Sequence, residues 1–406
     1  MTAAITAPSG IVKGSLNLPS SKSISNRLLI IKALCKGPVE ITGLSEALDT
    51  QLLAELLQSG QDTLNCGHGG TTFRFISAYR ATMQEAKTIT GSERMKNRPI
   101  GPLVDSLKKL GAEIKYLGKE GFPPLRISGG NLLNPEITIR GDISSQFITA
   151  ILLIAPSLPG GLIINIEGTL VSKPYIDMTL NILGHFGITT SWKSNKIQVS
   201  PGEYFPGSFI VEPDWSSASY WYSIVALAKE ADIFIEGFDE HSIQGDAVVK
   251  SIFGLFGVKT DFSQKGIRLY KTRFEAHQLF YDFRECPDLA QAVIVTAAGL
   301  GIQGHFTGLE TLRIKETDRI NALKTELEKL GATIEITEGD GLKLISGIKK
   351  EKANTMISTY NDHRMAMAFA PLSIVCKTLN IENPGVVKKS YPGFWSNLRE
   401  TGFTVS

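Results

Sequence analysis

The chain has 406 residues, of which 42% are hydrophobic and 20% are charged. Its length, about 2.7 times 150 residues, predicts two or three domains, and its apolar fraction excludes a disordered or fibrous chain. Lys and Arg number 42 against 40 Asp and Glu, for a formal net charge of +2. This balance provides no overall field for nucleic acid or an anionic membrane, so any anion preference must come from a local cluster of cations.

The cysteines and the first residues indicate the compartment. The four cysteines lie far apart and form no CxxC pair: Cys35, Cys66, Cys286 and Cys376. A disulfide framework or structural zinc site is therefore not expected, and a reducing compartment fits the sequence. The start, MTAAITAPSG, lacks the cationic and apolar regions of a secretory signal, and the apolar runs are shorter than a membrane span. We expect a cytoplasmic protein without a membrane partner.

An amphipathic stretch that ends in glycine, mostly followed by a β-branched run, recurs along the chain. The glycines are residues 60, 111, 187, 257, 331 and 402, which are separated by 51, 76, 70, 74 and 71 residues. Leu103, Leu107 and Leu110 share one face of a predicted helix, and a glycine after such a helix suits a left-handed cap. Helix–glycine–strand junctions occur in any α/β protein, but near-constant spacing favours genuine repetition.

Six repeats are too many for one hydrophobic core. We therefore predict an α/β protein of two lobes with three repeats each, the first repeat being about 20 residues short. Ligands are then expected in the cleft between the lobes.

Several predicted helices in the first half begin with polar residues. Residues 18–27, LPSSKSISNR, place hydroxyls, Lys22 and Arg27 at a helix start, which suits a phosphate or carboxylate, although serines there are also ordinary caps. Residues 67–74, GHGGTTFR, let a ligand approach the backbone but match no nucleotide-binding fingerprint. Residues 93–99, ERMKNRP, carry three cations in five residues, a run whose default explanation is a solvated surface.

Two further polar clusters open apolar helices, at residues 142–147 (DISSQF) and 171–175 (VSKPY). Their hydroxyl and amide groups can bind the hydroxyls of a small polar ligand.

The second half contains four candidate segments. Residues 286–288, CPD, place Asp288 at a helix start, where it is either an N-cap or a base. Residues 312–319, LRIKETDR, hold five charges in seven residues, and Glu316 and Arg319 could simply pair along a helix. Residues 360–365, YNDHRM, set His363 beside Arg364, and residues 387–392, VKKSYP, include Lys389. A histidine such as His363 is usually a buried core residue, but the neighbouring Arg364 at a helix start favours a ligand-binding role to the same degree.

Basic side chains thus recur at element ends while few acids accompany them. If these ends face one cleft, the local field is strongly positive and suits ligands with several negative charges. The cations are Lys22, Arg27, Arg98, Lys315, Arg319, Arg364 and Lys389.

The segments LPSSKSISNR, RMKNRPI, GDISSQF, VSKPYIDMTL, DWSSASY, IQGD, LRIKETDR, YNDHRMAM and KKSYP resemble, in order and across nearly the whole chain, the 5-enolpyruvylshikimate-3-phosphate synthase family of the shikimate pathway. The resemblance implies an inside-out α/β barrel fold: two lobes, each of three βαβαββ units, with the first unit shortened. It also implies that residues 1–18 plus 213–406 form the lobe with both termini, on the phosphoenolpyruvate and catalytic side. Residues 19–212 would form an inserted lobe on the shikimate 3-phosphate side, with the active site in the interlobe cleft.

The implied activity is transfer of the enolpyruvyl group of phosphoenolpyruvate to the 5-hydroxyl of shikimate 3-phosphate, with release of phosphate and without a metal or organic cofactor. By resemblance, shikimate 3-phosphate would be bound by Ser23, Arg27, Ser144, Ser145, Gln146, Ser172, Tyr175, Asp288 and Lys315. Phosphoenolpyruvate would be bound by Lys22, Gly70, Arg98, Arg319, Arg364 and Lys389.

The chemistry of addition and elimination suggests catalytic roles. Asp288 is the candidate base for the hydroxyl, and Glu316 the candidate for proton transfer at the methylene, with Lys22 as an alternative. Lys22 and His363 could assist departure of phosphate. The family commonly has Asn-Ala-Gly-Thr where this chain has His68-Gly69-Gly70-Thr71.

Three other functions fit the sequence less well. The sister transferase that acts on UDP-N-acetylglucosamine shares the repeats, but it has a Lys-Asn pair near its start and typically a reactive loop cysteine. This chain has Lys22-Ser23 and no cysteine in RMKNRPIG. A noncatalytic binding protein for phosphorylated metabolites would have lost Asp288 and Glu316, and an RNA 3′-phosphate cyclase would have a basic surface. We expect a monomer with two small-molecule substrates and no nucleic-acid partner.

Overall fold

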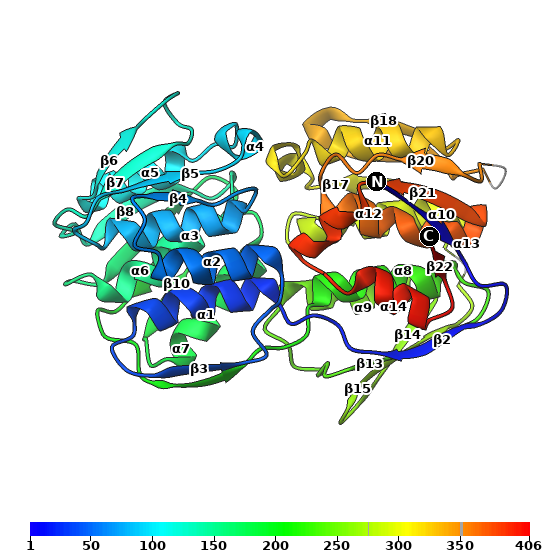
Figure 1. Cartoon of the computed structure of the whole chain (residues 1–406), viewed down its shortest axis with the longest axis horizontal. Coiled ribbons are helices and arrows are strands. Elements are labelled where there is room, and N and C mark those ends of the chain that lie inside the picture. The colour runs from blue at the N-terminus through cyan, green and yellow to red at the C-terminus, as the bar shows by residue number, and fades with distance from the viewer. Residues whose placement is uncertain (275, 350–351) are drawn as a thin grey trace. The chain divides into compact units, whose positions relative to one another are not determined.

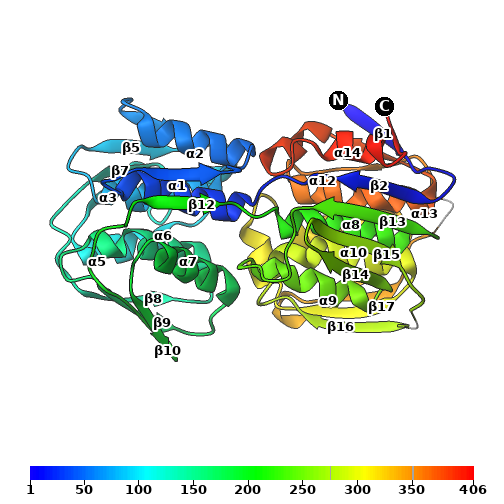
Figure 2. The ribbon, with the colours of Figure 1, turned by 90° about the horizontal axis from the view of Figure 1, so that it is seen from below.

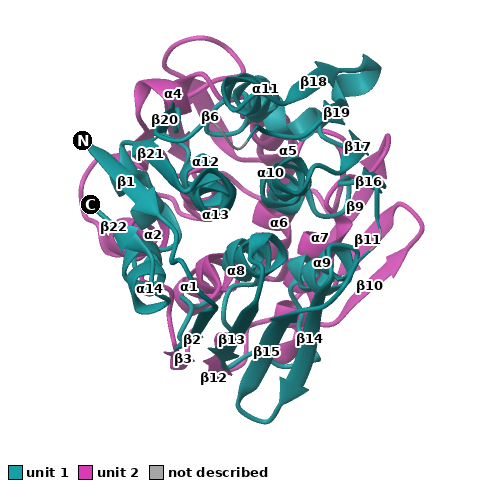
Figure 3. Cartoon of the chain, turned by 90° about the vertical axis from the view of Figure 1, so that its right-hand side faces the viewer, with its two compact units in different colours: residues 1–20, 212–406 teal, residues 21–211 magenta. Residues whose placement is uncertain are grey.

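The computed structural model describes residues 1–274, 276–349 and 352–406. These residues form two compact units, coloured separately in Figure 3: unit 1 is residues 1–20 and 212–406, and unit 2 is residues 21–211. The segment at which the chain leaves unit 1 and the segment at which it returns lie side by side within unit 1. Ser20 forms a bridge with Pro213, and the backbone N–H of Asp214 donates to the carbonyl of Pro19 at 2.9 Å.

The described part of unit 1 contains three four-stranded sheets built from βαβαββ repeats (Figure 1). In two of these sheets the first two strands of a repeat are parallel, and a hairpin adds two antiparallel strands. The first repeat is β2 (Val12–Leu16), α8 (Trp215–Leu227), β13 (Ala231–Glu236), α9 (Val249–Gly254), β14 (Val258–Ser263) and β15 (Gly266–Lys271). The second is β16 (Gln278–Asp282), α10 (Ala290–Leu300), β17 (Gln303–Thr307), α11 (Arg319–Lys329), β18 (Thr333–Ile336) and β19 (Leu342–Ser346).

The third repeat of unit 1 is completed by the N-terminal strand. It contains β20 (Thr355–Ile357), α12 (His363–Phe369), α13 (Ser373–Cys376), β21 (Thr378–Glu382), α14 (Phe394–Glu400) and β22 (Thr404–Val405). β1 (Thr2–Thr6) lies between β21 and β22 and is antiparallel to both. Figure 2 shows β1 beside the two ends of the chain. Both termini therefore belong to one sheet.

Unit 2 repeats the same plan, with one reduced copy. Two of its sheets are four-stranded: β4 (Thr63–Asn65), β5 (Lys87–Thr90), β6 (Glu113–Tyr116) and β7 (Leu125–Ser128), and then β8 (Glu136–Arg140), β9 (Leu162–Glu167), β10 (Thr190–Lys193) and β11 (Lys196–Val199). Among the described residues, the third sheet has only β3 (Val39–Thr42) and β12 (Gly207–Ile210), which run parallel. The helices are α1 (Lys22–Leu34), α2 (Leu48–Gln58), α3 (Gly70–Ala81), α4 (Glu93–Lys96), α5 (Gly101–Leu110), α6 (Ser145–Ile154) and α7 (Lys173–His185).

The repeat prediction is confirmed, including the shortened first copy. Five of the six junction glycines have positive φ, at 119°, 82°, 76°, 84° and 92° for Gly111, Gly187, Gly257, Gly331 and Gly402. The prediction was wrong for Gly60. After α2 the chain turns at Ser59 in an extended conformation and leads directly into β4 of the next sheet, because the reduced repeat has no hairpin to enter.

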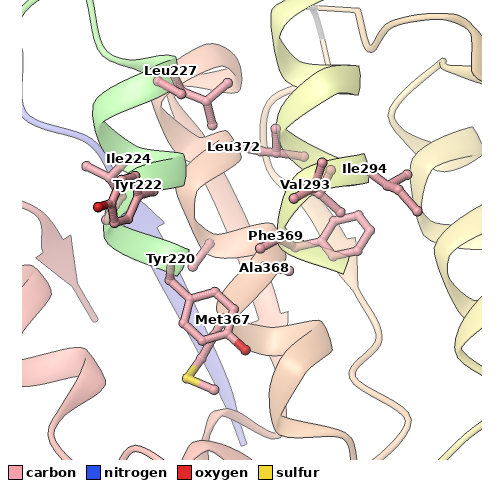
Figure 4. Close-up of a cluster of buried hydrophobic side chains, with 14 of the residues drawn as sticks. Tyr220, Tyr222, Ile224, Leu227, Val293, Ile294, Met367, Ala368, Phe369 and Leu372 are labelled. Carbon is pink, nitrogen blue, oxygen red and sulfur yellow. The ribbon is translucent and has the colours of Figure 1, made fainter. Parts of the chain in front are cut away.

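The first helix of each repeat lies inside its unit. In unit 1, Figure 3 shows α8, α10 and α12 side by side with the sheets around them. Of the 13 residues of α8, all but Ser216 are buried, which is typical of a helix that is apolar on every face. Figure 4 shows the resulting cluster, to which α8 contributes Tyr220 and Ile224, α10 Val293, and α12 Phe369. In unit 2, α1, α3 and α6 pack in the same way.

The leucines predicted to share a face of α5 are all buried: Leu103, Leu107 and Leu110. Within the described ranges, every helix is too short or too polar to cross a bilayer.

Candidate active site

In unit 1, Asp288 is surrounded by three cations. Its Oδ2 accepts a hydrogen bond from Nη2 of Arg364 at 2.8 Å, and its backbone carbonyl accepts one from Nη1 of the same residue at 2.8 Å. Its Oδ1 lies 3.4 Å from Nη1 of Arg319 and 3.8 Å from Nζ of Lys315. The carboxylate is 25% exposed, so the group is accessible to a ligand.

Asp288 does not cap the helix that it opens. The short 3₁₀ turn at Pro287–Leu289 and the following α10 have no side-chain cap. Burial raises the pKa of Asp288, but the neighbouring cations, led by Arg364, lower it by more. The net pKa lies well below the ordinary value of 3.8, so the carboxylate is fully ionised at neutral pH.

Arg319, the first residue of α11, joins three carboxylates. Its Nε donates to Oδ2 of Asp362 at 2.7 Å and its Nη2 to Oε2 of Glu316 at 2.9 Å, in addition to the Asp288 contact. Burial lowers the pKa of Arg319, but these carboxylates raise it by more, so the guanidinium remains charged. The predicted pairing with Glu316 thus exists, but it is one part of a larger network.

Lys389 extends this network to a fourth segment. Its Nζ donates to Oε1 of Glu316 at 2.6 Å, and it ends the 3₁₀ helix η7 (Pro384–Lys389). Four cations and three carboxylates therefore meet in unit 1: Lys315, Arg319, Arg364 and Lys389 with Asp288, Glu316 and Asp362. Since the carboxylates balance most of the cations, this cluster is less strongly positive than the cations alone predict.

Asp362 and His363 form the start of α12. Oδ1 of Asp362 accepts from the backbone N–H of Arg364 at 2.9 Å and so caps the helix. His363 is 2% exposed, and its Nδ1 lies 3.6 Å from Oδ1 of Asp362. The imidazole is therefore buried beside the ion-pair network, within one residue of Arg364.

In unit 2, two arginines lie against the first residue of α3. A Cβ placed on Gly70 would come within 2.5 Å of Nη1 of Arg98 and 2.7 Å of Nη1 of Arg74. The two side chains are only 4% and 2% exposed, and Nη1 of Arg74 also donates to Oε1 of Gln146 at 2.8 Å. A helix N-terminus flanked by two buried guanidinium groups is suited to an anion.

Lys22, the first residue of α1, is paired with an acid. Its Nζ lies 3.3 Å from Oδ2 of Asp49, whose side chain is 9% exposed. The hydroxyl of Thr72 donates to the backbone carbonyl of Asp49 at 3.0 Å, which holds the start of α2 against α3. The lysine side chain is 17% exposed, so it is accessible despite this pair.

Arg27 has a different role from the other cations, because its hydrogen bonds are to neutral hydroxyl and carbonyl groups. Its Nε donates to the hydroxyl of Thr179 at 2.8 Å, and its Nη1 and Nη2 donate to the carbonyls of Ser23 and Tyr175 at 2.7 and 3.0 Å. Burial lowers the pKa of Arg27 to about 10. The side chain thus connects α1 to α7, and it also binds the first turn of α1 at Ser23.

The remaining predicted residues lie at helix starts of unit 2. Ser144 caps α6 by accepting from the N–H of Gln146 at 3.3 Å, and Ser145 is buried. Ser172 precedes α7 with φ 58°, a left-handed conformation that is unfavourable for serine, and it makes no side-chain cap. His68 lies at the start of α3, with Nδ1 2.9 Å from Oγ of Ser92.

The structure therefore places the predicted residues in two groups, one in each unit. Unit 1 holds Asp288, Lys315, Glu316, Arg319, His363, Arg364 and Lys389, and unit 2 holds Lys22, Ser23, Arg27, Gly70, Arg98, Ser144, Ser145, Gln146, Ser172 and Tyr175. Sequence reasoning missed the importance of Asp49, Arg74 and Asp362. Each of these residues has a feature that the sequence shows. Asp49 is an acid in the first turn of a helix, Arg74 follows Gly70 by one helical turn, and Asp362 directly precedes an apolar helix.

Among the described residues, no group of three or more His, Cys, Asp or Glu side chains is placed to hold a metal ion.

Comparison with known proteins gives consistent results. The family model for EPSP synthase (3-phosphoshikimate 1-carboxyvinyltransferase) matches residues 6–60 and 57–398. A 3-phosphoshikimate 1-carboxyvinyltransferase of Bacteroides fragilis is 47% identical over 403 residues, covering 99% of this chain and 98% of that protein. The enzyme of the same name from Shewanella piezotolerans is 36% identical over 417 residues, covering 95% of this chain and 96% of that protein. The solved structure of EPSP synthase from Acinetobacter baumannii matches the fold with a TM-score of 0.78 at 22% identity, covering 100% of both chains.

Proposed function

Because the chain belongs to the EPSP synthase family, we propose that its two polar clusters serve one reaction, in which an enolpyruvyl group is transferred. The chain is a transferase that moves this group from phosphoenolpyruvate to the 5-hydroxyl of shikimate 3-phosphate and releases phosphate. In this proposal, unit 1 supplies most of the catalytic groups, and unit 2 supplies most of the groups that bind shikimate 3-phosphate.

The observation that carries the proposal is the network around Asp288. One accessible carboxylate, the candidate base, lies in contact with three cations, which are candidates for binding substrate anions. Arg319, Arg364 and Lys389 are proposed to bind phosphoenolpyruvate, whose carboxylate and phosphate suit guanidinium and ammonium groups. Lys315 and Asp288 are proposed to bind shikimate 3-phosphate.

Binding of the substrates is expected to activate Asp288. The same cations that lower its pKa also make it a weak base. When substrate anions engage Arg364 and Lys315, these cations stabilise the Asp288 carboxylate less. The pKa of Asp288 then rises toward the value of a useful base, and the carboxylate can take the proton of the attacking 5-hydroxyl.

The other proton transfers are assigned to neighbouring groups. Glu316 is held by Arg319 and Lys389 and is proposed to take up a proton from solvent when substrate anions engage these two cations. The protonated carboxyl group then delivers this proton to the methylene carbon as the carbon–oxygen bond forms. Elimination reverses this transfer: the methyl group returns a proton as the bond to phosphate breaks. The surrounding cations stabilise the departing phosphate, with assistance from Lys22 and His363.

In unit 2, the start of α3 is the proposed anion site. The backbone at Gly70, together with Arg98, would bind phosphoenolpyruvate, and Lys22 would contact both substrates. The hydroxyl, amide and guanidinium groups proposed to bind shikimate 3-phosphate are Ser23, Arg27, Ser144, Ser145, Gln146, Ser172 and Tyr175.

A phosphate-release assay tests this function. The purified chain is mixed with phosphoenolpyruvate and shikimate 3-phosphate in the presence of a chelator, and we expect release that requires both substrates. Asp288→Ala should lower kcat by about 10²- to 10⁴-fold, whereas Asp261→Ala, which removes an exposed carboxylate of unit 1, should not. Release with UDP-N-acetylglucosamine as the only acceptor would identify the sister activity. Binding of both substrates without release would identify a binding protein.

A further inference from the structure

Two consecutive residues directly before the unit 1 cluster have unfavourable backbone conformations. Tyr360 has φ 53° and Asn361 has φ 56°, which places both in the left-handed region. This region is uncommon for residues other than glycine, especially for a bulky aromatic residue, and it persists only where surrounding contacts hold it. The next residue is Asp362, which caps α12 and binds Arg319.

The first contact that holds this turn is a buried carboxylate on α11. Glu326 is 0% exposed, and its Oε1 accepts from the hydroxyl of Tyr360 at 2.6 Å. Its Oε2 accepts from the backbone N–H of Ser358 at 3.1 Å, and Nζ of Lys329 lies 2.7 Å from the same oxygen. Burial and the Glu326 carboxylate raise the pKa of Tyr360, so its hydroxyl keeps the proton that this bond requires. Glu326 shares α11 with Arg319.

The second contact comes from the segment that carries Lys389. Oδ1 of Asn361 accepts from Nδ2 of Asn383 at 2.8 Å. Asn383 immediately precedes η7, whose last residue is Lys389. It also has a left-handed conformation, with φ 46°, and its backbone N–H donates to the carbonyl of Met1 at 2.9 Å.

These contacts connect the three segments that carry the cations proposed to bind phosphoenolpyruvate. Tyr360 is tied to α11, which begins with Arg319, and Asn361 is tied to the start of η7, which ends with Lys389. The turn itself continues into Asp362, His363 and Arg364. We propose that the Tyr360–Asn361 turn, held by Glu326 and Asn383, is a positioning device that sets the relative placement of Arg319, Arg364 and Lys389. This inference rests on the proposed function, and it adds positioning residues that touch neither substrate.

Tyr360→Phe tests the first contact by removing one hydroxyl. We expect the KM for phosphoenolpyruvate to rise about five- to tenfold, the effect of one lost hydrogen bond to a charged group, while the KM for shikimate 3-phosphate changes less than twofold. Tyr270→Phe is the matched control, because it removes a tyrosine hydroxyl that donates to Asp261 at 2.9 Å on an exposed hairpin of the same unit. It should leave both KM values unchanged.

Substitutions of Asn361 test the second contact and the backbone separately. Asn361→Gly removes the bond to Asn383 but permits positive φ, whereas Asn361→Ala removes the bond and disfavours the conformation. If the turn positions the cations, the KM for phosphoenolpyruvate should increase in the order wild type, Asn361→Gly, Asn361→Ala. A role limited to folding would lower the yield or the thermal midpoint of the variants without raising the KM for phosphoenolpyruvate relative to the KM for shikimate 3-phosphate.

The outcomes distinguish this inference from the proposed function. A wild-type enzyme that releases phosphate, with a Tyr360→Phe variant whose two KM values are unchanged or rise equally, overturns the positioning role alone. A wild-type chain that releases no phosphate with both substrates overturns the proposed function and the positioning role together.

Discussion

Arg319 and Asp362 form an ion pair in which the side chains are 2% and 0% exposed, with Nε and Oδ2 2.7 Å apart. Both ions are also held by other groups: Arg319 by Glu316 and Asp288, and Asp362 by the N–H of Arg364. Removal of one partner leaves the other charge buried and incompletely paired, which is costly.

Asp362→Asn should therefore lower the free energy of unfolding by about 3 to 5 kcal/mol, measured by urea denaturation. The matched control is Asp232→Asn, which breaks the exposed pair of Asp232 with Arg268, at 2.7 Å between Oδ2 and Nη2. That variant should lose less than about 1 kcal/mol, because solvent screens an exposed pair. Similar losses for the two variants would show that burial of the Arg319 pair has no special energetic weight.

The lowered pKa of Asp288 predicts a pH dependence of stability. The pKa of this carboxyl is lower in the folded chain than in the unfolded chain, so its contribution is fully present above about pH 4 and is lost as the pH falls below that value. When it unfolds below about pH 4, the wild-type chain takes up as much as one proton more than the Asp288→Asn variant does. The free energy of unfolding of the wild type should therefore fall more steeply as the pH is lowered, by up to about 1.4 kcal/mol per pH unit. Urea denaturation of both proteins from pH 6 to pH 3 measures the difference, and parallel curves over that range would contradict it.

The close approach of two arginines to Gly70 predicts the effect of an added methyl group. Gly70→Ala must displace the guanidinium group of Arg98, which a Cβ would approach to 2.5 Å. Because the displaced atoms end flexible side chains, the fold should survive, and the KM for phosphoenolpyruvate should rise about tenfold, as for a lost hydrogen bond to a charged group.

Gly184→Ala is the control for this methyl group. Gly184 lies within α7 and has open space around the new Cβ, so alanine should stabilise the helix by about 0.5 to 1 kcal/mol without affecting either KM. An unchanged KM in Gly70→Ala would exclude the start of α3 from the phosphoenolpyruvate site.

The four thiols should differ in reactivity. Burial raises the pKa of Cys286 to about 12 and that of Cys376 to about 11, and it raises the pKa of Cys66 further. These buried thiols should react slowly with an aromatic disulfide reagent in the native protein, whereas the partly exposed Cys35 should react first. Cys35→Ser should abolish the fast phase, and its persistence would identify an unexpected opening of one unit.

Repeats and helix faces could be predicted from the sequence because they depend on local periodicity. Leu103, Leu107 and Leu110 are buried as their spacing indicates, and five junction glycines have the left-handed conformation expected of a helix cap. Gly60 differs because the conformation after α2 depends on whether a hairpin follows, and in the reduced repeat the chain passes directly to another sheet.

The site could be predicted only in part. The cations were found because basic residues at helix starts are unusual, and the local pair of Glu316 with Arg319 was predicted, but the partners distant in sequence were not. Asp49 is 27 residues from Lys22, and Asp362 is 43 residues from Arg319, so neither pairing can be derived from local spacing. An acid at a helix start is most often a cap, and Asp362 is indeed a cap, but its second oxygen binds Arg319.

The position of β1 between β21 and β22 determines when each unit can be completed during synthesis on the ribosome. Every strand of unit 2 has been synthesised once residue 210 is made, so its sheets can form after these residues leave the ribosome, while the rest of the chain is still being translated. The first strand of the protein, by contrast, has no partner until translation reaches residues 378–382. β1 must therefore remain unpaired until almost the entire chain has been made, and the sheet that contains both termini is completed last.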